Sequence, residues 1–166
     1  MKIQNSTTQT NFKAINIPKE SQRRFMAALR EECNADQLLR CVHVLEKEKK
    51  NLNHIILRDL GYIAGQKCNG HLIGYVNKKS YCNLDNVFFT PTIPEFLEKL
   101  SKKAGKSLDK TQKIERKAQD KLNKKELLES RKIRKEHIAK GYVTEEENCN
   151  YLLGEIYKLI NHLPKA

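Results

Sequence analysis

The spacing of apolar residues changes twice along this chain. Phe12 to Ile17 alternates between apolar and polar residues, which is the period-2 pattern of a short strand. From Pro18 to about residue 50 the apolar residues lie three and four apart, which predicts two helices. Asn34, followed by Gln37 three residues later, marks the start of the second helix in the manner of a capping box. The N-terminal region therefore predicts a strand followed by a pair of helices.

The middle of the chain contains short runs of β-branched and aromatic residues instead. Asn69-Gly70 lies between two of these runs and is a strong hairpin signal, because both residues tolerate a positive φ. We expect an antiparallel meander of three or four strands, made by residues 54–57, 61–64, 71–76 and 86–89.

Helices are predicted for the remainder of the chain. Thr92 and Glu95 form a helix-start signal for a helix that ends near Gly105. No Gly or Pro occurs between Lys106 and Lys140, so that stretch predicts one long helix with Gly141 as its C-terminal cap.

A last helix is the most clearly amphipathic element of the sequence. Thr144 and Glu147 form another capping box at its start. Its apolar residues follow the i, i+3, i+4, i+7 spacing of one helical face, and we expect that face to pack on the core. They are Cys149, Leu152, Leu153, Ile156, Leu159, Ile160 and Leu163.

These elements predict an α+β fold: a small antiparallel β-meander packed with N-terminal helices, then a long basic helix and a C-terminal amphipathic helix. Leu, Ile, Val and Phe make up 42 of the 166 residues, which is enough for a core of moderate size. We divide the chain into a disordered polar N-terminus (1–11), an α+β core (12–104), the long basic helix (105–141) and a C-terminal helix that packs on the core (142–166).

The cysteines and the apolar runs indicate a cytoplasmic protein. The five cysteines are an odd number, are widely spread and include no C-x-x-C pair, so we expect reduced thiols rather than a disulfide framework. No apolar run approaches the ~18 residues that cross a bilayer. The polar N-terminus also lacks the apolar segment of a signal peptide.

Positive charge is concentrated in the predicted long helix. The chain carries 32 Lys+Arg and 20 Asp+Glu, a net charge of +12. Residues 102–140 alone hold 15 basic and 6 acidic side chains, an excess of +9. A charge density of this kind attracts polyanions.

Within that helix, seven basic residues fall in a sector of about 80°, counted at 100° per residue. Only Leu128 interrupts this basic stripe, and most of the acidic residues lie on other sides of the helix. Like charges at i, i+4 repel unless an anion lies beside them. We therefore predict nucleic-acid contacts by the stripe residues Lys110, Lys113, Lys117, Lys121, Lys124, Arg131 and Lys135.

The sequence thus predicts a non-enzymatic accessory protein that binds the phosphate backbone of RNA or DNA. Lysine outnumbers arginine 24 to 8, and lysine positions a phosphate chain without reading its bases. One alternative is a protein-interaction module, or self-association, through the thin apolar side of the helix. Another is a structural protein whose charged helix face is only solvated. A membrane surface is not predicted, because the helix has no Trp, Phe or Tyr to insert.

Two weaker patterns in the sequence would indicate a metal-binding protein or an enzyme. Cys68, His71, Cys82 and His54 could supply zinc ligands, although the second C-x₂-C or C-x₂-H pair of a zinc knuckle is missing. A plain hairpin with incidental Cys and His side chains is the favoured interpretation, so we predict neither metal nor cofactor.

The runs Gly61-Tyr62-Ile63 and Ile73-Gly74-Tyr75-Val76 resemble the paired strands of the GIY-YIG nucleases, with the letters permuted in both halves. The resemblance implies that the two runs pair in one sheet. No helix with an arginine follows the second run directly, as that family requires, so no catalytic residue is carried over.

Overall fold

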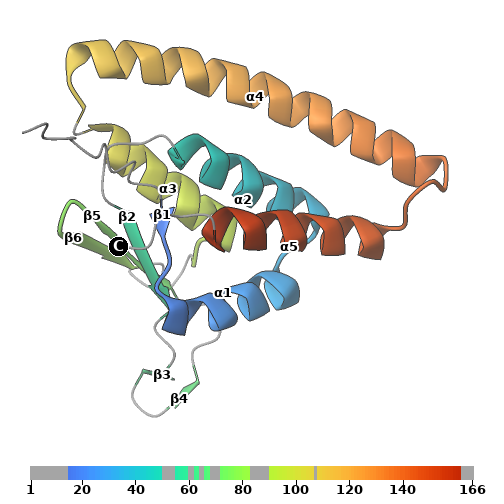
Figure 1. Cartoon of the computed structure of the whole chain (residues 1–166), viewed down its shortest axis with the longest axis horizontal. Helices are drawn as coiled ribbons and strands as arrows, with labels where there is room; N and C mark the ends of the chain where they lie inside the picture. The colour runs from blue at the N-terminus through green and yellow to red at the C-terminus, as the bar shows by residue number, and fades with distance from the viewer. Residues whose placement is uncertain are drawn as a thin grey trace, which may run out of the picture.

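The predicted α+β class is confirmed by the structure, a computed structural model that describes residues 15–49, 55–59, 62–63, 66–67, 72–82, 90–106 and 108–161. A four-stranded mixed sheet lies among three helices, and two further helices complete the chain (Figure 1). The helices are α1 (Lys19–Glu32), α2 (Ala35–Glu48), α3 (Ile93–Lys106), α4 (Lys110–Ala139) and α5 (Glu145–Asn161).

The main sheet has the strand order β1-β2-β5-β6. Its strands are β1 (Ile15–Asn16), β2 (Ile55–Asp59), β5 (Leu72–Val76) and β6 (Lys79–Cys82). Strands β2, β5 and β6 pair antiparallel in that order, as the predicted meander requires, and β1 adds to the edge parallel to β2.

Strand β6 was not predicted from the sequence. It forms a hairpin with β5 through a two-residue turn at Asn77 and Lys78, whose φ angles are 48° and 72°. Two positive φ values in succession are typical of a type I′ turn. Asn77 is the signal in the sequence, but lysine is an unusual second residue for such a turn.

The predicted pairing of residues 61–64 with 71–76 is wrong. Strand β3 (Tyr62–Ile63) pairs instead with β4 (Gln66–Lys67) in a separate two-stranded sheet, and β5 pairs with β2 and β6. The two runs that resemble the GIY-YIG strands therefore lie in different sheets. The Asn69-Gly70 signal, the predicted strand at 86–89 and the polar N-terminus at 1–11 lie outside the described residues.

Helix starts follow the predicted capping residues. The Gln37 amide donates to the side chain of Asn34 at 2.9 Å, and that of Thr92 donates to Glu95 at the same distance. At the start of α5, the Thr144 amide donates to the Glu147 carboxylate at 2.8 Å.

The start of the long helix needs correction. Helix α3 continues through Gly105 to Lys106, and α4 begins only at Lys110 rather than at residue 105 or 106. Asp109 caps α4 in a capping box with Gln112, whose amide donates to the Asp109 carboxylate at 2.8 Å. Its predicted C-terminal end is confirmed, because Gly141 has φ +69° and its amide donates to Ile138 at 2.9 Å.

The hydrophobic core lies between the sheet and helices α1, α2, α3 and α5. Helix α2 is central and contacts α3, α5 and α4. As predicted, α5 buries Leu152, Leu153, Ile156 and Ile160, whereas α4 buries no residue. Leu163 lies outside the described residues. Within the described ranges, no helix combines the length and apolar character that a membrane span needs.

Candidate nucleic-acid interface

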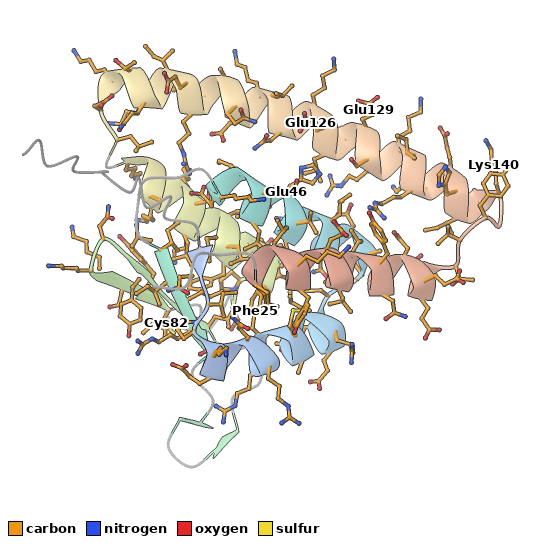
Figure 2. All side chains as sticks on the ribbon, in the orientation of Figure 1. Phe25, Glu46, Cys82, Glu126, Glu129 and Lys140 are labelled. Atoms are coloured by element: carbon orange, nitrogen blue, oxygen red, sulfur yellow. The ribbon has the colours of Figure 1, made fainter. Side chains whose placement is uncertain are left out.

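Helix α4 is an uninterrupted rod that runs alongside the other helices. It spans 30 residues, which corresponds to about 45 Å at 1.5 Å per residue. Figure 1 shows it running along one side of the molecule, past α3, α2 and α5. In Figure 2, side chains project from it away from the rest of the molecule along its whole length, and the labels of Glu126 and Glu129 mark its middle.

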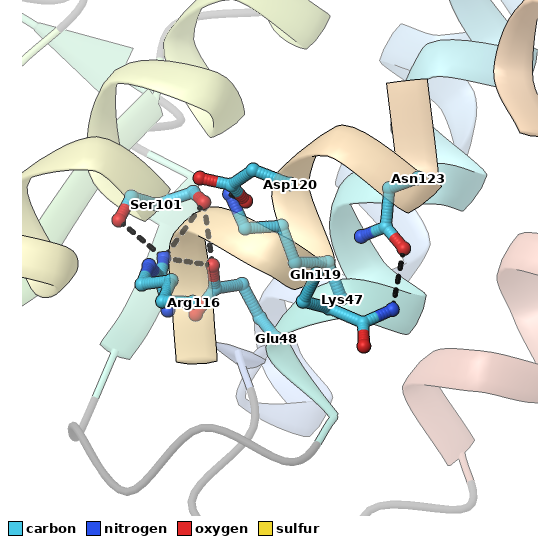
Figure 3. A network of polar contacts seen from close by, with 7 residues as sticks. All are labelled: Lys47, Glu48, Ser101, Arg116, Gln119, Asp120 and Asn123. Atoms are coloured by element: carbon cyan, nitrogen blue, oxygen red, sulfur yellow. Dashed lines mark hydrogen bonds and ion pairs between the residues drawn. The ribbon is translucent and has the colours of Figure 1, made fainter. Parts of the chain in front are cut away.

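One end of α4 is attached to the body through a buried carboxylate. Arg116 reaches inward and donates to Glu48 of α2 at 2.5 Å and to the carbonyl of Ser101 in α3 at 2.7 Å (Figure 3). The Ser101 hydroxyl donates to the same carboxylate at 2.5 Å. The Glu48 side chain is fully buried and that of Arg116 is 14% exposed. A buried carboxylate is costly without a cationic partner, so this contact fixes both side chains.

Further polar contacts continue along the inner side of α4. Asp120 lies 2.5 Å from Lys47 of α2, and Arg131 donates to Asp36 at the start of α2 at 2.5 Å. Arg134 contacts Asn148 of α5 and lies over the ring of Tyr151, 5.2 Å from its centroid. The rod is therefore attached by polar contacts at intervals along its length.

The stripe residues divide into two groups in the structure. All six lysines are exposed, and none forms an ion pair with a carboxylate of the described residues; they are Lys110, Lys113, Lys117, Lys121, Lys124 and Lys135. Arg131, at the edge of the sector, is instead half-buried and paired with Asp36. Six of the seven predicted residues are thus exposed together, five of them in succession from Lys110 to Lys124 and Lys135 further along the helix.

Arginine and lysine have different positions on α4. Its three arginines, Arg116, Arg131 and Arg134, all contact other helices. Its eight lysines are all exposed. Lys117 and Lys135 directly follow Arg116 and Arg134, which face inward. Because consecutive residues of a helix are rotated by 100°, the stripe lies on the side of α4, about a quarter turn from the face that contacts the body. The planar guanidinium suits fixed, bidentate contacts, whereas lysine is a flexible point charge.

A groove lies beside the stripe where α4 passes α2 and α3. It has a volume of about 500 Å³ and includes Lys113 and Lys117 of the stripe. The opposite wall, in α3, contributes Lys102 and Lys106, which are exposed. Among the described residues, these four lysines have no carboxylate in ion-pair contact. Sequence reasoning missed the two α3 lysines, because only the fold places them opposite α4.

The acidic residues in the groove are already engaged. Glu98 accepts two hydrogen bonds from the guanidinium of Arg40, at 2.8 and 2.7 Å, and Asp120 pairs with Lys47. Burial lowers the pKa of His43 on α2, which disfavours the charged imidazole, and this side chain is not among those that line the groove. The net positive charge of the groove therefore comes from lysines.

The other patterns in the sequence gain no support from the described residues. They contain no cluster of three or more His, Cys, Asp or Glu side chains suited to a metal ion. Of the four candidate ligands, Cys82 is half-buried in β6, whereas His54, Cys68 and His71 lie outside the described part of the chain. Cys33, Cys41, Cys82 and Cys149 are not joined in disulfides.

No protein-family model matches the chain, and neither the curated proteins nor the solved structures contain a match to it. A function for this surface therefore has to be inferred from its own geometry and charge.

Proposed function

We propose that the protein binds the phosphate backbone of a nucleic acid along the lysine stripe of α4. The observation that carries this proposal is the separation of charge across the helix. Of the arginines that face the body, Arg116 and Arg131 are paired with the carboxylates of Glu48 and Asp36, whereas the six stripe lysines face solvent without a described carboxylate in contact.

The repulsion within the stripe supports the same proposal. Lys113, Lys117 and Lys121 follow one another at i, i+4 spacing, and each such pair of like charges costs a few tenths of a kcal/mol. A row of phosphates alongside would turn this cost into attraction and would release the counterions condensed on the nucleic acid. Because the exposed cations are lysines, we expect binding that depends little on base sequence.

The test compares two double variants with the same change in net charge. Lys121→Glu/Lys124→Glu changes the stripe outside the groove, and Lys19→Glu/Lys79→Glu changes exposed residues of α1 and β6 as a control. Binding of fluorescein-labelled duplex DNA and single-stranded RNA is measured by anisotropy at several salt concentrations. We expect the stripe variant to weaken binding of every sequence and to lower the slope of log affinity against log salt by about two.

Two outcomes contradict the proposal. One is that the wild-type protein leaves the anisotropy of both probes unchanged at low salt. The other is that the stripe variant and the control variant bind with the same affinity and the same salt slope, since the overall charge and not the stripe would then attract the probe.

A second candidate function is the binding of another protein chain, and exposed apolar residues favour it. Ile114, Leu122, Leu128 and Ile133 of α4 are 46–70% exposed, so four large apolar side chains of one helix are in contact with water. Contact with a partner would remove that area from water. This candidate predicts a molar mass that rises with concentration, or a partner that stays bound at high salt after nuclease treatment. Leu122→Gln/Ile133→Gln would abolish either behaviour.

A further inference from the structure

We propose that the groove between α3 and α4 is a binding site for consecutive phosphate groups. This inference deepens the proposed function, because Lys113 and Lys117 belong to both the stripe and the groove. It adds Lys102 and Lys106 of α3, which lie outside the stripe and form the opposite wall. The shared chemistry is a short run of phosphates, supplied either by a nucleic-acid backbone or by a free polyphosphate compound.

The first argument is the balance of charge. Six cations and two carboxylates line the groove, and the carboxylates of Glu98 and Asp120 are already held by Arg40 and Lys47. Four lysines from two helices thus approach one space. The C-terminal dipole of α3 is equivalent to about half a negative charge, so it offsets only a small part of theirs.

The second argument is that the floor of the groove is fixed in advance. Arg116 is held by Glu48 and Ser101, and this contact sets the separation of α3 and α4. Gly105 allows the close approach, because a Cβ atom there would lie 2.8 Å from Nε of Arg116. Walls that are already in place lose less freedom when a ligand binds.

The third argument is size. A groove of about 500 Å³ is in the range of small-ligand sites and exceeds what a single phosphate fills. Its lysines come from both walls, so successive phosphates can each meet a different ammonium group. Since the lining contains no Phe, Tyr or Trp on which a base could stack, the phosphates alone are recognised.

The experiment uses the full chain, two probes and three matched double variants. The probes are sodium tripolyphosphate, measured by calorimetry, and a labelled twelve-nucleotide single strand, measured by anisotropy. Lys102→Gln/Lys106→Gln changes only the groove, Lys121→Gln/Lys124→Gln only the stripe, and Lys19→Gln/Lys79→Gln neither. All six positions are exposed, and thermal melting verifies that each variant is folded.

We expect the groove variant to weaken tripolyphosphate binding about tenfold, because it removes two exposed ammonium–phosphate contacts that each contribute a few-fold in affinity, while the other variants stay near wild type. If the groove variant also weakens oligonucleotide binding, the site accepts phosphates from both sources. If it weakens only oligonucleotide binding, the backbone is the source.

The remaining outcomes separate this inference from the proposed function. If the groove variant binds both probes as the wild type does while the stripe variant loses oligonucleotide affinity, the phosphate site is overturned and the proposed function stands. If the groove variant loses tripolyphosphate affinity while the stripe variant binds the oligonucleotide normally, the stripe proposal fails and the groove remains as a site for a small polyphosphate.

Discussion

Helices α4 and α5 are neighbours in the chain and both begin with a capping box, yet they are attached to the molecule in opposite ways. Helix α5 has 17 residues and places five of them in the interior, namely Asn148, Leu152, Leu153, Ile156 and Ile160. Helix α4 is almost twice as long, with 30 residues, and buries none.

The difference lies in what the inner side of each helix carries. Four aliphatic side chains hold α5, and each fully buried one is worth about 1.5–3 kcal/mol relative to exposure. Helix α4 is held by Arg116, Arg131 and Arg134, which pair with groups on α2, α3 and α5. Such contacts fix a helix at a few points and leave most of its circumference in solvent. A rod attached in this way keeps its other sides available for a ligand.

The largest effect is expected where α4 depends on a buried charge. Arg116→Met removes the guanidinium that faces the buried Glu48 carboxylate, and breaking such a pair costs about 3–5 kcal/mol. Urea unfolding followed by circular dichroism measures this loss. Arg131→Met is the matched change at a more exposed pair on the same helix, since the Arg131 and Asp36 side chains are 30% and 47% exposed, and we expect a cost below about 1 kcal/mol.

A double variant checks the cause of that loss. Replacing both partners, in Glu48→Met/Arg116→Met, removes the buried charge together with its partner and should recover much of the stability. Equal stability of wild type and Arg116→Met would show that α4 is not anchored at this point.

A truncation on each helix tests the comparison directly. Ile156 of α5 is fully buried, so Ile156→Ala should destabilise the protein by about 2–5 kcal/mol through lost burial and the cavity left behind. Ile114 of α4 is 70% exposed, so Ile114→Ala should change the free energy of unfolding by less than about 0.5 kcal/mol. Thermal or urea unfolding of the pair measures both. A comparable loss in the two variants would mean that the outer side of α4 is covered in solution.

Local signals were the part of the fold that the sequence predicted well. Capping boxes at Asn34 and Thr144 involve residues only three apart, so they do not depend on distant contacts. The start of α4 was misplaced although its signal is present, since Asp109 and Gln112 have the same spacing. The absence of Gly and Pro indicates where a helix can run, whereas a cap determines where it begins.

Strand pairing could not be read in the same way. Strand β2 does not pair with β3 or β4, which follow it in the sequence, but with the more distant β5. In that pairing Ile55 lies opposite Val76. Which strands pair depends on which of them complete the core under α3. Strand β5 lies close to that helix at Gly74, where an added Cβ atom would be only 2.4 Å from the Leu100 side chain. Short apolar runs do not show which run they will pair with.

The candidate site was predictable only as far as it belongs to one helix. The stripe follows from 100° per residue along α4, and six of its seven residues are exposed together. The pairing of Arg131 with Asp36 joins residues 95 apart, and Lys102 and Lys106 reach the groove from another helix. Contacts of that kind exist only after the chain has folded.

Apart from the matched controls, the smallest loss of stability is expected from variants at the two helix caps, and these variants test whether the difference between α4 and α5 extends to their N-terminal turns. Asp109→Ala and Thr144→Ala each remove the side chain that accepts from the first turn, a loss of about 1 kcal/mol. In α5 the first turn leads directly into the core at Asn148, so the loss should appear in the global free energy of unfolding. In α4 no residue is buried, so Asp109→Ala should instead speed hydrogen exchange of the amides near Gln112, with little change in global stability. Hydrogen exchange and urea unfolding of both variants measure the two quantities. If Asp109→Ala lowered global stability as much as Thr144→Ala, the N-terminal turns of the two helices would be coupled to the core to the same degree, and the difference in attachment would not extend to their ends.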